Sequence, residues 1–174
     1  RESMYVHVYR NPRSASLDHL GWQLRQARQV PIELIDKATL REIEPEIADQ
    51  YQAAILIKQQ GRASDPAGIG IALAEKALAT GARHLQAKVQ EINPDQGEGC
   101  RLVTDQGEYN ANKIVLAAGV WSCQLLKRFG IKLPLEAERG YHLLLRNPGV
   151  TINNSVMDAE QKYVASLMKA GVRV

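Results

Sequence analysis

Three small residues, Ala117-Ala118-Gly119, have the clearest potential for ligand binding, because they end a predicted strand, 113–119, that is apolar from Ile114 onward. Small residues at the carboxyl end of a parallel strand let a ligand approach backbone amides that no side chain blocks. A tight strand-to-helix turn also uses glycine for steric reasons alone, so ligand binding and a structural turn both remain open. Gly68-Ile69-Gly70 is less suitable, since Leu73 stands where a dinucleotide fingerprint needs its third glycine.

His142 differs from the other histidines because it stands beside Arg139 and Tyr141 around a glycine. His142 is therefore kept as a candidate functional residue, whereas the other histidines are expected to be surface or core residues. The spacing of the four histidines matches no metal site, so no metal ligand is predicted. No serine stands in a nucleophile elbow and no paired carboxylates suggest acid–base chemistry, so no catalytic residue is assigned. Glu44 and Glu46, on either side of a proline, are predicted to be solvated.

Tyr5, His7 and Tyr9 alternate along one predicted strand and therefore share one face of it. Such a row could line a pocket, since tyrosine and histidine combine an apolar ring with a polar tip. A polar outer face of a sheet explains the same row equally well. Both interpretations remain open.

The first sixty residues are predicted to form two strands and two short helices. In order, these are a strand over 4–10, a helix over 17–27, a helix over 37–44 and a strand over 53–58. Ser14 or Ser16 would cap the first helix, and Asp36 would cap the second.

The clearest helix signal lies between Asp65, a good N-cap, and Gly81, which is well placed just past the helix end. Its stripe of Ile69, Leu73 and Ala77 should pack against another element. The other predicted elements are a strand over 85–89, a hairpin of 101–104 and 108–111, a strand over 113–119, a helix capped by Ser122 and closed by Gly130, an extended segment over 133–146 and a strand over 163–168. Residues 113–119 are apolar on both faces, as in a parallel strand covered by helices. This order is typical of part of a nucleotide-binding α/β domain.

Composition excludes several classes of protein. The chain has 174 residues, 45% of them hydrophobic, and a net charge of only +3, which excludes global disorder. Its longest apolar run is far shorter than the ~20 residues that span a bilayer, and no signal peptide is visible. Basic residues are dispersed and there is one phenylalanine, so a nucleic-acid partner is not expected. Cys100 and Cys123 share no motif and are expected to be free thiols.

Both ends of the sequence fall on predicted strands, without a cap or a polar tail. A natural domain rarely begins and ends in this way. The sequence is therefore expected to be a segment of a longer protein.

Several blocks of the sequence resemble the family of flavin-dependent amino-acid oxidases and dehydrogenases, which includes D-amino-acid dehydrogenase, glycine oxidase and sarcosine oxidase. The blocks are Gly61-Arg62-Ala63-Ser64-Asp65-Pro66, Gly81-Ala82, Thr104-Asp105-Gln106-Gly107, Ile114-Val115-Leu116-Ala117-Ala118-Gly119-Val120-Trp121-Ser122, Leu133-Pro134-Leu135-Glu136, Arg139-Gly140-Tyr141-His142 and the closing residues 168–174. The resemblance covers nearly the whole chain, and its last stretch is most similar to the small subunit of bacterial D-amino-acid dehydrogenases.

The resemblance implies a mixed α/β and α+β fold, with part of an FAD-binding Rossmann-like domain and part of an antiparallel-sheet substrate domain. Residues 61–130 would belong to the FAD-binding part, and residues 1–60 and 131–174 to the substrate part. The implied cofactor contacts come from Val89, Ala117, Ala118, Gly119 and Trp121. Arg139, Tyr141 and His142 would lie on the substrate side. Arg173 could match the family's carboxylate-binding arginine, but it is not assigned that role.

The function that the resemblance implies for the whole protein is oxidation of amino acids, D-amino acids first, by hydride transfer to the flavin of FAD. The family's glycine fingerprint and its C-terminal segment have no counterpart in this sequence, so the segment alone is expected to be inactive. One alternative is a glycine- or sarcosine-type oxidase, and another is a non-catalytic binding or assembly module.

The expected partners are an amino-acid substrate, the missing N- and C-terminal parts of its own chain, an electron acceptor of the respiratory chain, and a second copy of the segment. The expected location is the cytoplasm, including peripheral placement at the inner face of the cytoplasmic membrane.

Overall fold

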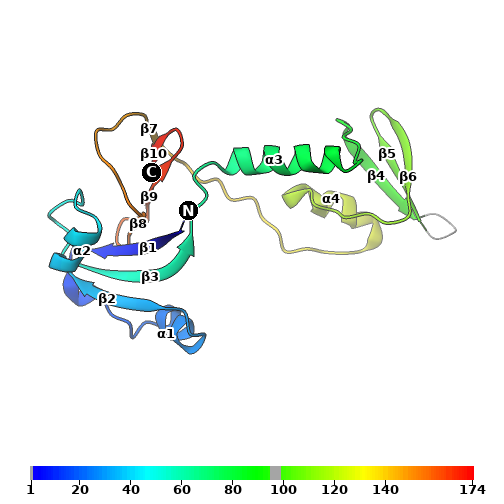
Figure 1. The fold of residues 1–174 in the computed structure, drawn as a ribbon. Coiled ribbons are helices and arrows are strands. Elements are labelled where there is room, and N and C mark those ends of the chain that lie inside the picture. Colours follow the sequence, from blue (N-terminus) through cyan, green and yellow to red (C-terminus); the bar gives the residue numbers. More distant parts are fainter. Residues whose placement is uncertain (1, 95–98) are drawn as a thin grey trace. The chain divides into compact units, whose positions relative to one another are not determined.

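A computed structural model describes residues 2–94 and 99–174, which fall into two compact units (Figure 1). Unit 1 consists of Arg1–Leu73 and Tyr141–Val174, and unit 2 is Ala74–Gly140. The sequence predicted boundaries near residues 60 and 130, whereas the chain passes between the units after Leu73 and after Gly140. The assignment of these parts to substrate and to cofactor binding stays a prediction.

Unit 1 is built on a seven-stranded sheet with the order β2-β3-β1-β8-β9-β10-β7. Its strands are β1 (Glu2–Tyr9), β2 (Ile32–Asp36), β3 (Ala53–Gly61), β7 (Leu144–Leu145), β8 (Ser155–Asp158), β9 (Val164–Met168) and β10 (Gly171–Arg173). Only the β1–β8 pair is parallel among the described strands, with Val8 opposite Asp158. This pairing brings the N-terminal strand beside β8, a strand from the C-terminal part of the chain, in the middle of one sheet. The strands expected over 4–10, 53–58 and 163–168 are confirmed as β1, β3 and β9.

The helix α2 (Lys37–Ile43) covers one face of this sheet, which we call the α2 face. Alternate residues of neighbouring strands, such as Val6, Leu56 and Val156, pack there against the fully buried Leu40. Asp36 caps α2 as predicted, because its Oδ1 accepts a hydrogen bond from the Thr39 amide at 2.9 Å.

The helix α1 (Leu20–Ala27) covers the opposite face, the α1 face. His7 lies between two aromatic rings there, with centroids 4.8 Å from Tyr5 and 5.0 Å from Trp22. The row of Tyr5, His7 and Tyr9 is therefore an aromatic cluster packed with α1, and a polar outer face is excluded.

The predicted serine cap of α1 is wrong. A short 3-10 turn, η1 (Pro12–Ser14), occupies the region first, and α1 begins only after His19. Ser16 instead donates a hydrogen bond to the carboxylate of Asp18, within the loop before the helix.

The helix α3 (Pro66–Ala79) has the predicted ends but not the predicted packing. Asp65 Oδ1 accepts a hydrogen bond from the Gly68 amide at 2.9 Å, and Gly81 follows the helix with a φ of +97°. However, none of its residues is buried, and Leu73 is 66% exposed. The expected packed stripe is wrong here, because no element among the described residues covers it.

Unit 2 contains a three-stranded antiparallel sheet of β4 (Val89–Pro94), β5 (Cys100–Thr104) and β6 (Gly107–Ala111). The predicted hairpin is confirmed, with Gly107 at a φ of +128° in its turn. The predicted strand over 85–89 is instead loop up to Lys88, since β4 begins at Val89. Cys100 and Cys123 are free thiols, as expected.

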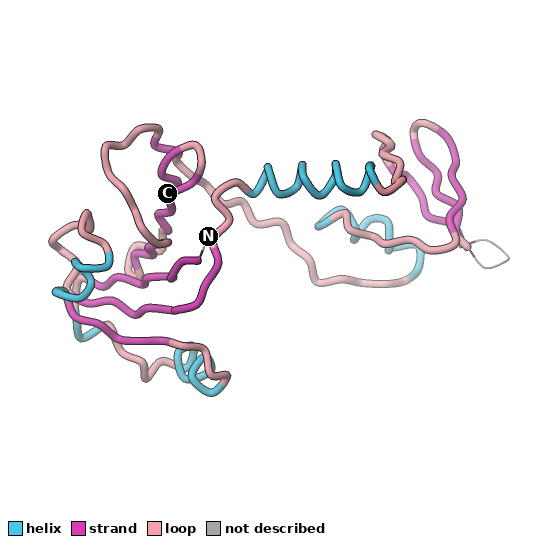
Figure 2. The backbone as a smooth tube through the Cα atoms, in the orientation of Figure 1, coloured by secondary structure: helices cyan, strands magenta, loops and turns pink. Residues whose placement is uncertain are grey.

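Residues 113–118 are loop, although the sequence predicted a strand buried on both faces (Figure 2). Val115 is 90% exposed. A parallel strand needs a hydrogen-bonded neighbour and covering helices, and none of the described strands pairs with this segment.

The next helix, α4 (Ser122–Leu126), follows a 3-10 turn, η2 (Gly119–Trp121), and has Trp121 rather than Ser122 at its N-cap. Gly130 closes the following 3-10 turn, η3 (Lys127–Phe129), with a φ of +69°. The expected extended segment over 133–146 holds only the short strand β7, which lies in unit 1.

Candidate functional site

A hollow in unit 2 is bordered by most of the predicted cofactor residues. It measures about 750 Å³, and Val89, Ala117, Ala118 and Trp121 all line it. The other lining residues are Ala87, Lys88, Gln90, Ile92, Leu102, Ile114, Val115, Leu116, Gln124 and Leu125. The structure thus brings together the start of β4, the 114–118 loop and α4 around one mostly apolar space.

The chemistry of this hollow suits a flat, largely apolar group. Small alanines leave space beside the backbone, and the indole of Trp121 is 69% exposed and free to stack on a planar ring. Gly119 directly follows the lining residues, with a φ of +55°, and no heavy atom lies within 4 Å of the position where a side chain would begin. The residues present therefore fit the adenine end of a dinucleotide such as FAD.

An ion pair links β4 to the turn that follows α4, beside this hollow. Arg128, just after α4, pairs with Glu91 of β4 at 2.5 Å, and this contact lowers the pKa of the Glu91 carboxyl below its usual value. Both side chains are about half exposed, so the pair positions α4 more than it stabilises the unit.

Unit 1 contains a basic hollow of about 400 Å³ beside β9 and β10. Two of the predicted substrate-side residues, Tyr141 and His142, line it together with Lys162 and Arg173. Neither Lys162 nor Arg173 has an acidic partner within ion-pair distance among the described residues. Since no aspartate or glutamate lines the described part of this hollow, it suits an anionic group such as a carboxylate.

Arg139, the third predicted substrate-side residue, lies in unit 2. It stands in an exposed stretch that lines neither the unit 2 hollow nor the basic hollow of unit 1. The unit boundary therefore falls between Arg139 and Tyr141, and only Tyr141 and His142 are found at the basic hollow.

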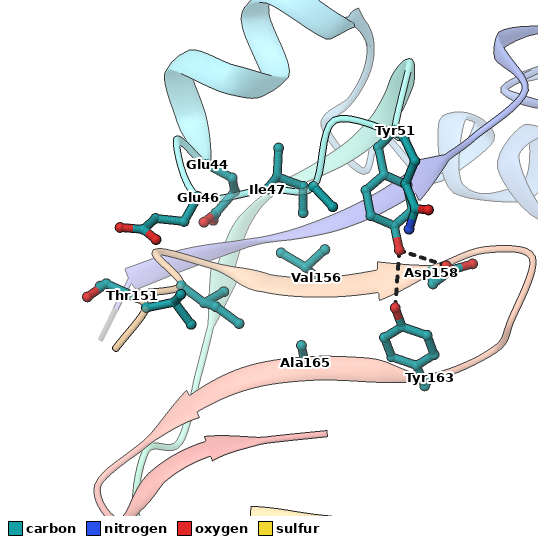
Figure 3. Close-up of a pocket in the computed structure, with 13 residues that line it drawn as sticks. Glu44, Glu46, Ile47, Tyr51, Thr151, Val156, Asp158, Tyr163 and Ala165 are labelled. Atoms are coloured by element: carbon teal, nitrogen blue, oxygen red, sulfur yellow. Dashed lines mark hydrogen bonds between the residues drawn. The ribbon is translucent and has the colours of Figure 1, made fainter. Parts of the chain in front are cut away.

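A third hollow, of about 200 Å³, lies on the α2 face of unit 1 (Figure 3). Tyr51 and Tyr163 point toward each other at one end of it, and Asp158 lies beside Tyr51. The Tyr51 hydroxyl lies 2.8 Å from Asp158 Oδ2 and 3.1 Å from the Tyr163 hydroxyl. Burial raises the pKa of Tyr51, and its hydrogen bonds to Tyr163 and Asp158 raise it further.

Glu44, near the other end of this hollow, was predicted to be solvated, and this prediction is wrong. It is 2% exposed, and its carboxylate accepts hydrogen bonds from the amides of Asn153 and Asn154 at 2.9 and 2.7 Å. Glu46 is exposed, as expected. The difference arises because the 150–154 loop, more than a hundred residues later, closes over Glu44.

The sequence did not point to Tyr51, Asp158 or Lys162. Tyr51 and Asp158 are 107 residues apart, and no local motif links them. The one available signal was weak: Asp158 ends a strand-like run and is followed by a turn, where an aspartate often accepts backbone hydrogen bonds.

Comparison with known proteins decides the family. A family model described as "FAD dependent oxidoreductase" matches residues 1–174, which is the whole chain. The chain belongs to this family.

Curated relatives in the FAD-dependent oxidoreductase family are named for amino-acid oxidation. The chain is 34% identical over 154 residues to a D-amino-acid oxidase of Bradyrhizobium diazoefficiens, covering 88% of this chain and 37% of that protein. It is 27% identical over 150 residues to a D-amino acid dehydrogenase of Rhizobium rhizogenes, covering 83% of this chain and 36% of that protein. A glycine oxidase of Geobacillus kaustophilus is 29% identical over 146 residues, covering 83% of this chain and 38% of that protein. The chain thus spans little more than a third of the length of these relatives.

The solved structure of glycine oxidase from Geobacillus kaustophilus has the same fold, with a TM-score of 0.85 at 22% identity, over 99% of this chain and 46% of that one. The mixed α/β and α+β fold that the resemblance implied is therefore confirmed, and so are the family and its FAD dependence.

Proposed function

We propose that the protein to which this chain belongs oxidises amino acids, with D-amino acids as the preferred substrates. The observation that carries the proposal is the basic hollow of unit 1, in which Lys162 and Arg173 have no acidic partner among the described residues. The 34% identity to a D-amino-acid oxidase supports the preference for the D series.

The substrate carboxylate would bind in this basic hollow. The Arg173 guanidinium can form two parallel hydrogen bonds to a carboxylate, and Lys162 adds a second positive charge. Tyr141 and His142 at the rim can contribute further hydrogen bonds. These residues would bind and orient the amino acid.

The adenine end of FAD would lie in the unit 2 hollow, against Val89, Ala117, Ala118 and Trp121, with the Gly119 backbone close by. FAD, when bound, supplies the acceptor for the hydride that leaves the amino-acid α-carbon. The apolar walls of the unit 2 hollow would exclude water from one side of the adenine. The protein would thus hold FAD in place by packing against it.

The direct test uses the flavin-loaded full-length protein without oxygen. D-leucine, D-alanine, L-leucine, glycine and sarcosine are mixed with it in turn, and bleaching of the flavin absorbance is followed. Bleaching by the D-amino acids but not by L-leucine supports the proposal. Absence of bleaching with every compound overturns it and favours a non-catalytic binding module.

Substitution of the arginine tests the carboxylate contact. Arg173→Met should raise KM for the D-amino acid by about 10- to 100-fold, as expected for loss of hydrogen bonds to a charged group. The matched control is Arg13→Met, since Arg13 is also exposed but lines none of the three hollows. An unchanged KM for Arg173→Met would remove Arg173 from the binding site.

The second candidate function is a glycine- or sarcosine-type oxidase, which the 29% identity to a glycine oxidase favours. Bleaching by glycine or sarcosine in preference to D-leucine would select it. For the D-amino-acid enzyme we propose an electron acceptor of the respiratory chain. Its reduced flavin should then be reoxidised by a quinone analogue rather than by oxygen.

We further propose that the 174-residue chain by itself binds FAD weakly, is inactive and self-associates. Exposed apolar residues of α3 and of the 113–118 segment, such as Leu73 and Val115, support self-association. Titration with FAD and sedimentation of the purified chain test both points, and a micromolar FAD site or a strictly monomeric profile would contradict them.

A cytoplasmic location is also proposed. No helix among the described residues is long and apolar enough to cross a membrane. Fractionation of cells that express the full-length protein tests the location.

A further inference from the structure

The hollow on the α2 face shares only Tyr163 with the basic hollow, and its other lining residues have no part in the proposed function. Its middle is apolar, formed by Ile47, Val156 and Ala165 (Figure 3). The two tyrosine hydroxyls lie at one end, and Glu44, Glu46 and Thr151 lie at the other. A ligand that fills this hollow therefore meets an apolar floor between two polar ends.

The hydrogen bonds around Asp158 fix the direction of every donor at the tyrosine end. Asp158 is 1% exposed, and its Oδ1 accepts from the amides of Glu160 at 2.9 Å and Gln161 at 2.7 Å. Its Oδ2 accepts from Arg10 Nη2 at 2.9 Å and from the Tyr51 hydroxyl at 2.8 Å. An ionised carboxylate can only accept, so the single hydroxyl hydrogen of Tyr51 is committed to Asp158.

This commitment determines the role of Tyr163. Because Tyr51 has no hydrogen left to donate, the 3.1 Å contact between the two hydroxyls must use the hydrogen of Tyr163. The Tyr163 oxygen then presents only lone pairs to the hollow. A ligand at this end must therefore donate a hydrogen bond.

The charges around the hollow favour a positive ligand. Three carboxylates line it, those of Glu44, Glu46 and Asp158, and none of the described residues that line it is lysine, arginine or histidine. Asp158 is paired with Arg10, whereas Glu44 and Glu46 form no ion pair among the described residues. The net charge around the hollow is therefore negative. Because Glu44 and Asp158 are buried, their charges act on a bound cation more strongly than they would in water, whereas Glu46 is exposed and contributes less.

We propose that this hollow binds an organic ammonium ion with a short apolar tail. The ammonium group donates to the Tyr163 oxygen, and the tail packs on Val156 and Ala165. The available volume of about 200 Å³ suits a small amine, since an engineered apolar cavity of about 150 Å³ binds benzene. The site belongs to unit 1 alone and requires neither FAD nor turnover.

The experiment is a titration of the 174-residue chain, followed by the NMR signals of Val156 and Ala165, with three ligands of equal length. n-Butylammonium should shift these signals in a saturable way. n-Butyrate, of similar shape but negative, and n-butanol, which is neutral, should bind at least about tenfold more weakly, as loss of a charge-assisted hydrogen bond predicts.

Two variants test whether the Tyr163 hydroxyl donates to Tyr51 and accepts from the ligand. Tyr163→Phe removes the acceptor and keeps the ring, so n-butylammonium should bind at least about tenfold more weakly. Tyr51→Phe frees the Tyr163 hydrogen for donation, so the preference for n-butylammonium over n-butyrate should fall. A merely structural role of Tyr51 would weaken all three ligands alike. Tyr109→Phe, in unit 2, is the matched control and should leave all affinities unchanged.

Equal binding of n-butyrate and n-butylammonium, no saturable shift with any ligand, or an unchanged affinity in Tyr163→Phe would each overturn the proposal. If Tyr51→Phe does not fold, the affinity of Tyr163→Phe for n-butylammonium tests the proposal by itself. The Tyr163 hydroxyl lies at the edge of the hydrogen-bond network around Asp158, so its removal should leave the fold intact. Because flavin bleaching is not measured, failure here leaves the proposed oxidation of amino acids untouched.

Discussion

Replacement of Asp158 by asparagine should strongly destabilise unit 1. The carboxylate is buried and accepts hydrogen bonds from Arg10, Tyr51 and the amides of Glu160 and Gln161. In Asp158→Asn, an amide nitrogen replaces one oxygen and faces two hydrogen-bond donors. At least two of the four hydrogen bonds are therefore lost, together with the negative charge that pairs with Arg10.

The expected loss can be worked from these contacts. A hydrogen bond to a charged group contributes about 1.5–3 kcal/mol, so two of them amount to about 3–6 kcal/mol. Breaking a buried ion pair costs about 3–5 kcal/mol, and this is an upper range here because the Arg10 side chain is 34% exposed. We expect the free energy of unfolding to fall by about 3–5 kcal/mol, which is a large part of the ~5–15 kcal/mol available to a typical domain.

The effect should depend on pH with a definite sign. Burial pushes the pKa of Asp158 upward, but hydrogen bonds from Gln161, Tyr51 and Glu160 and the charge of Arg10 outweigh it and lower the pKa below its usual value. The stabilisation is therefore fully present above the unfolded pKa of about 3.9 and is lost as pH falls through the folded value. The difference between wild type and variant should be constant from pH 6 to 8 and shrink in acid.

Urea unfolding of the wild-type chain and of Asp158→Asn, followed by circular dichroism at several pH values, measures both effects. Asp18→Asn is the control, because Asp18 is an exposed loop carboxylate that, among the described residues, accepts a hydrogen bond from the Ser16 hydroxyl alone. A loss below about 1 kcal/mol at pH 7, within the range of ordinary surface substitutions, would refute the hydrogen-bond count. A difference that grows in acid would refute the direction of the pKa shift.

Three further outcomes are expected. Glu44→Gln should lower the free energy of unfolding by about 1–3 kcal/mol, because it weakens the anchor of the 150–154 loop, whereas Glu46→Gln should change it little; equal effects in urea unfolding would contradict this. Gly119→Val in the full-length protein should reduce FAD retention, since a branched residue is strained at a φ of +55°, and unchanged flavin absorbance after purification would count against it. His7 should titrate near pH 4, because burial and the nearby charges of Arg25 and Lys162 lower its pKa to about 4. In the unfolded chain the same imidazole takes up its proton near pH 6.5. The contribution of His7 to the free energy of unfolding should therefore decrease as the pH falls from 6.5 toward 4. An NMR midpoint near 6.5 would refute it.

Several signals that act over a few residues were correctly predicted from sequence, although the serine caps of α1 and α4 were not. Asp36 and Asp65 cap the helices that follow them, and Gly107 and Gly130 adopt the positive φ of a turn and a helix end. Each of these features depends on hydrogen bonds or backbone sterics within one turn of chain, so the local residues are sufficient to determine it.

Burial could not be predicted in the same way. Residues 113–118 and the stripe on α3 have the apolar pattern of packed elements, yet Val115 and Leu73 are exposed. An apolar pattern indicates only that burial of that surface would be energetically favourable. Whether it is covered depends on a partner element, which among the described residues is absent.

The amino-acid sequence by itself determined the aspartate caps of α2 and α3, the hairpin of unit 2, and, through its motifs, the family and the FAD dependence. Only the tertiary structure decided which distant side chains meet. The parallel β1–β8 pairing brings Asp158 to Arg10, and the loop that follows β2 and α2 brings Tyr51 to the same carboxylate. The physical reason is that a buried charge needs several donors at once, and their arrival from separate strands and loops depends on the register of the whole sheet.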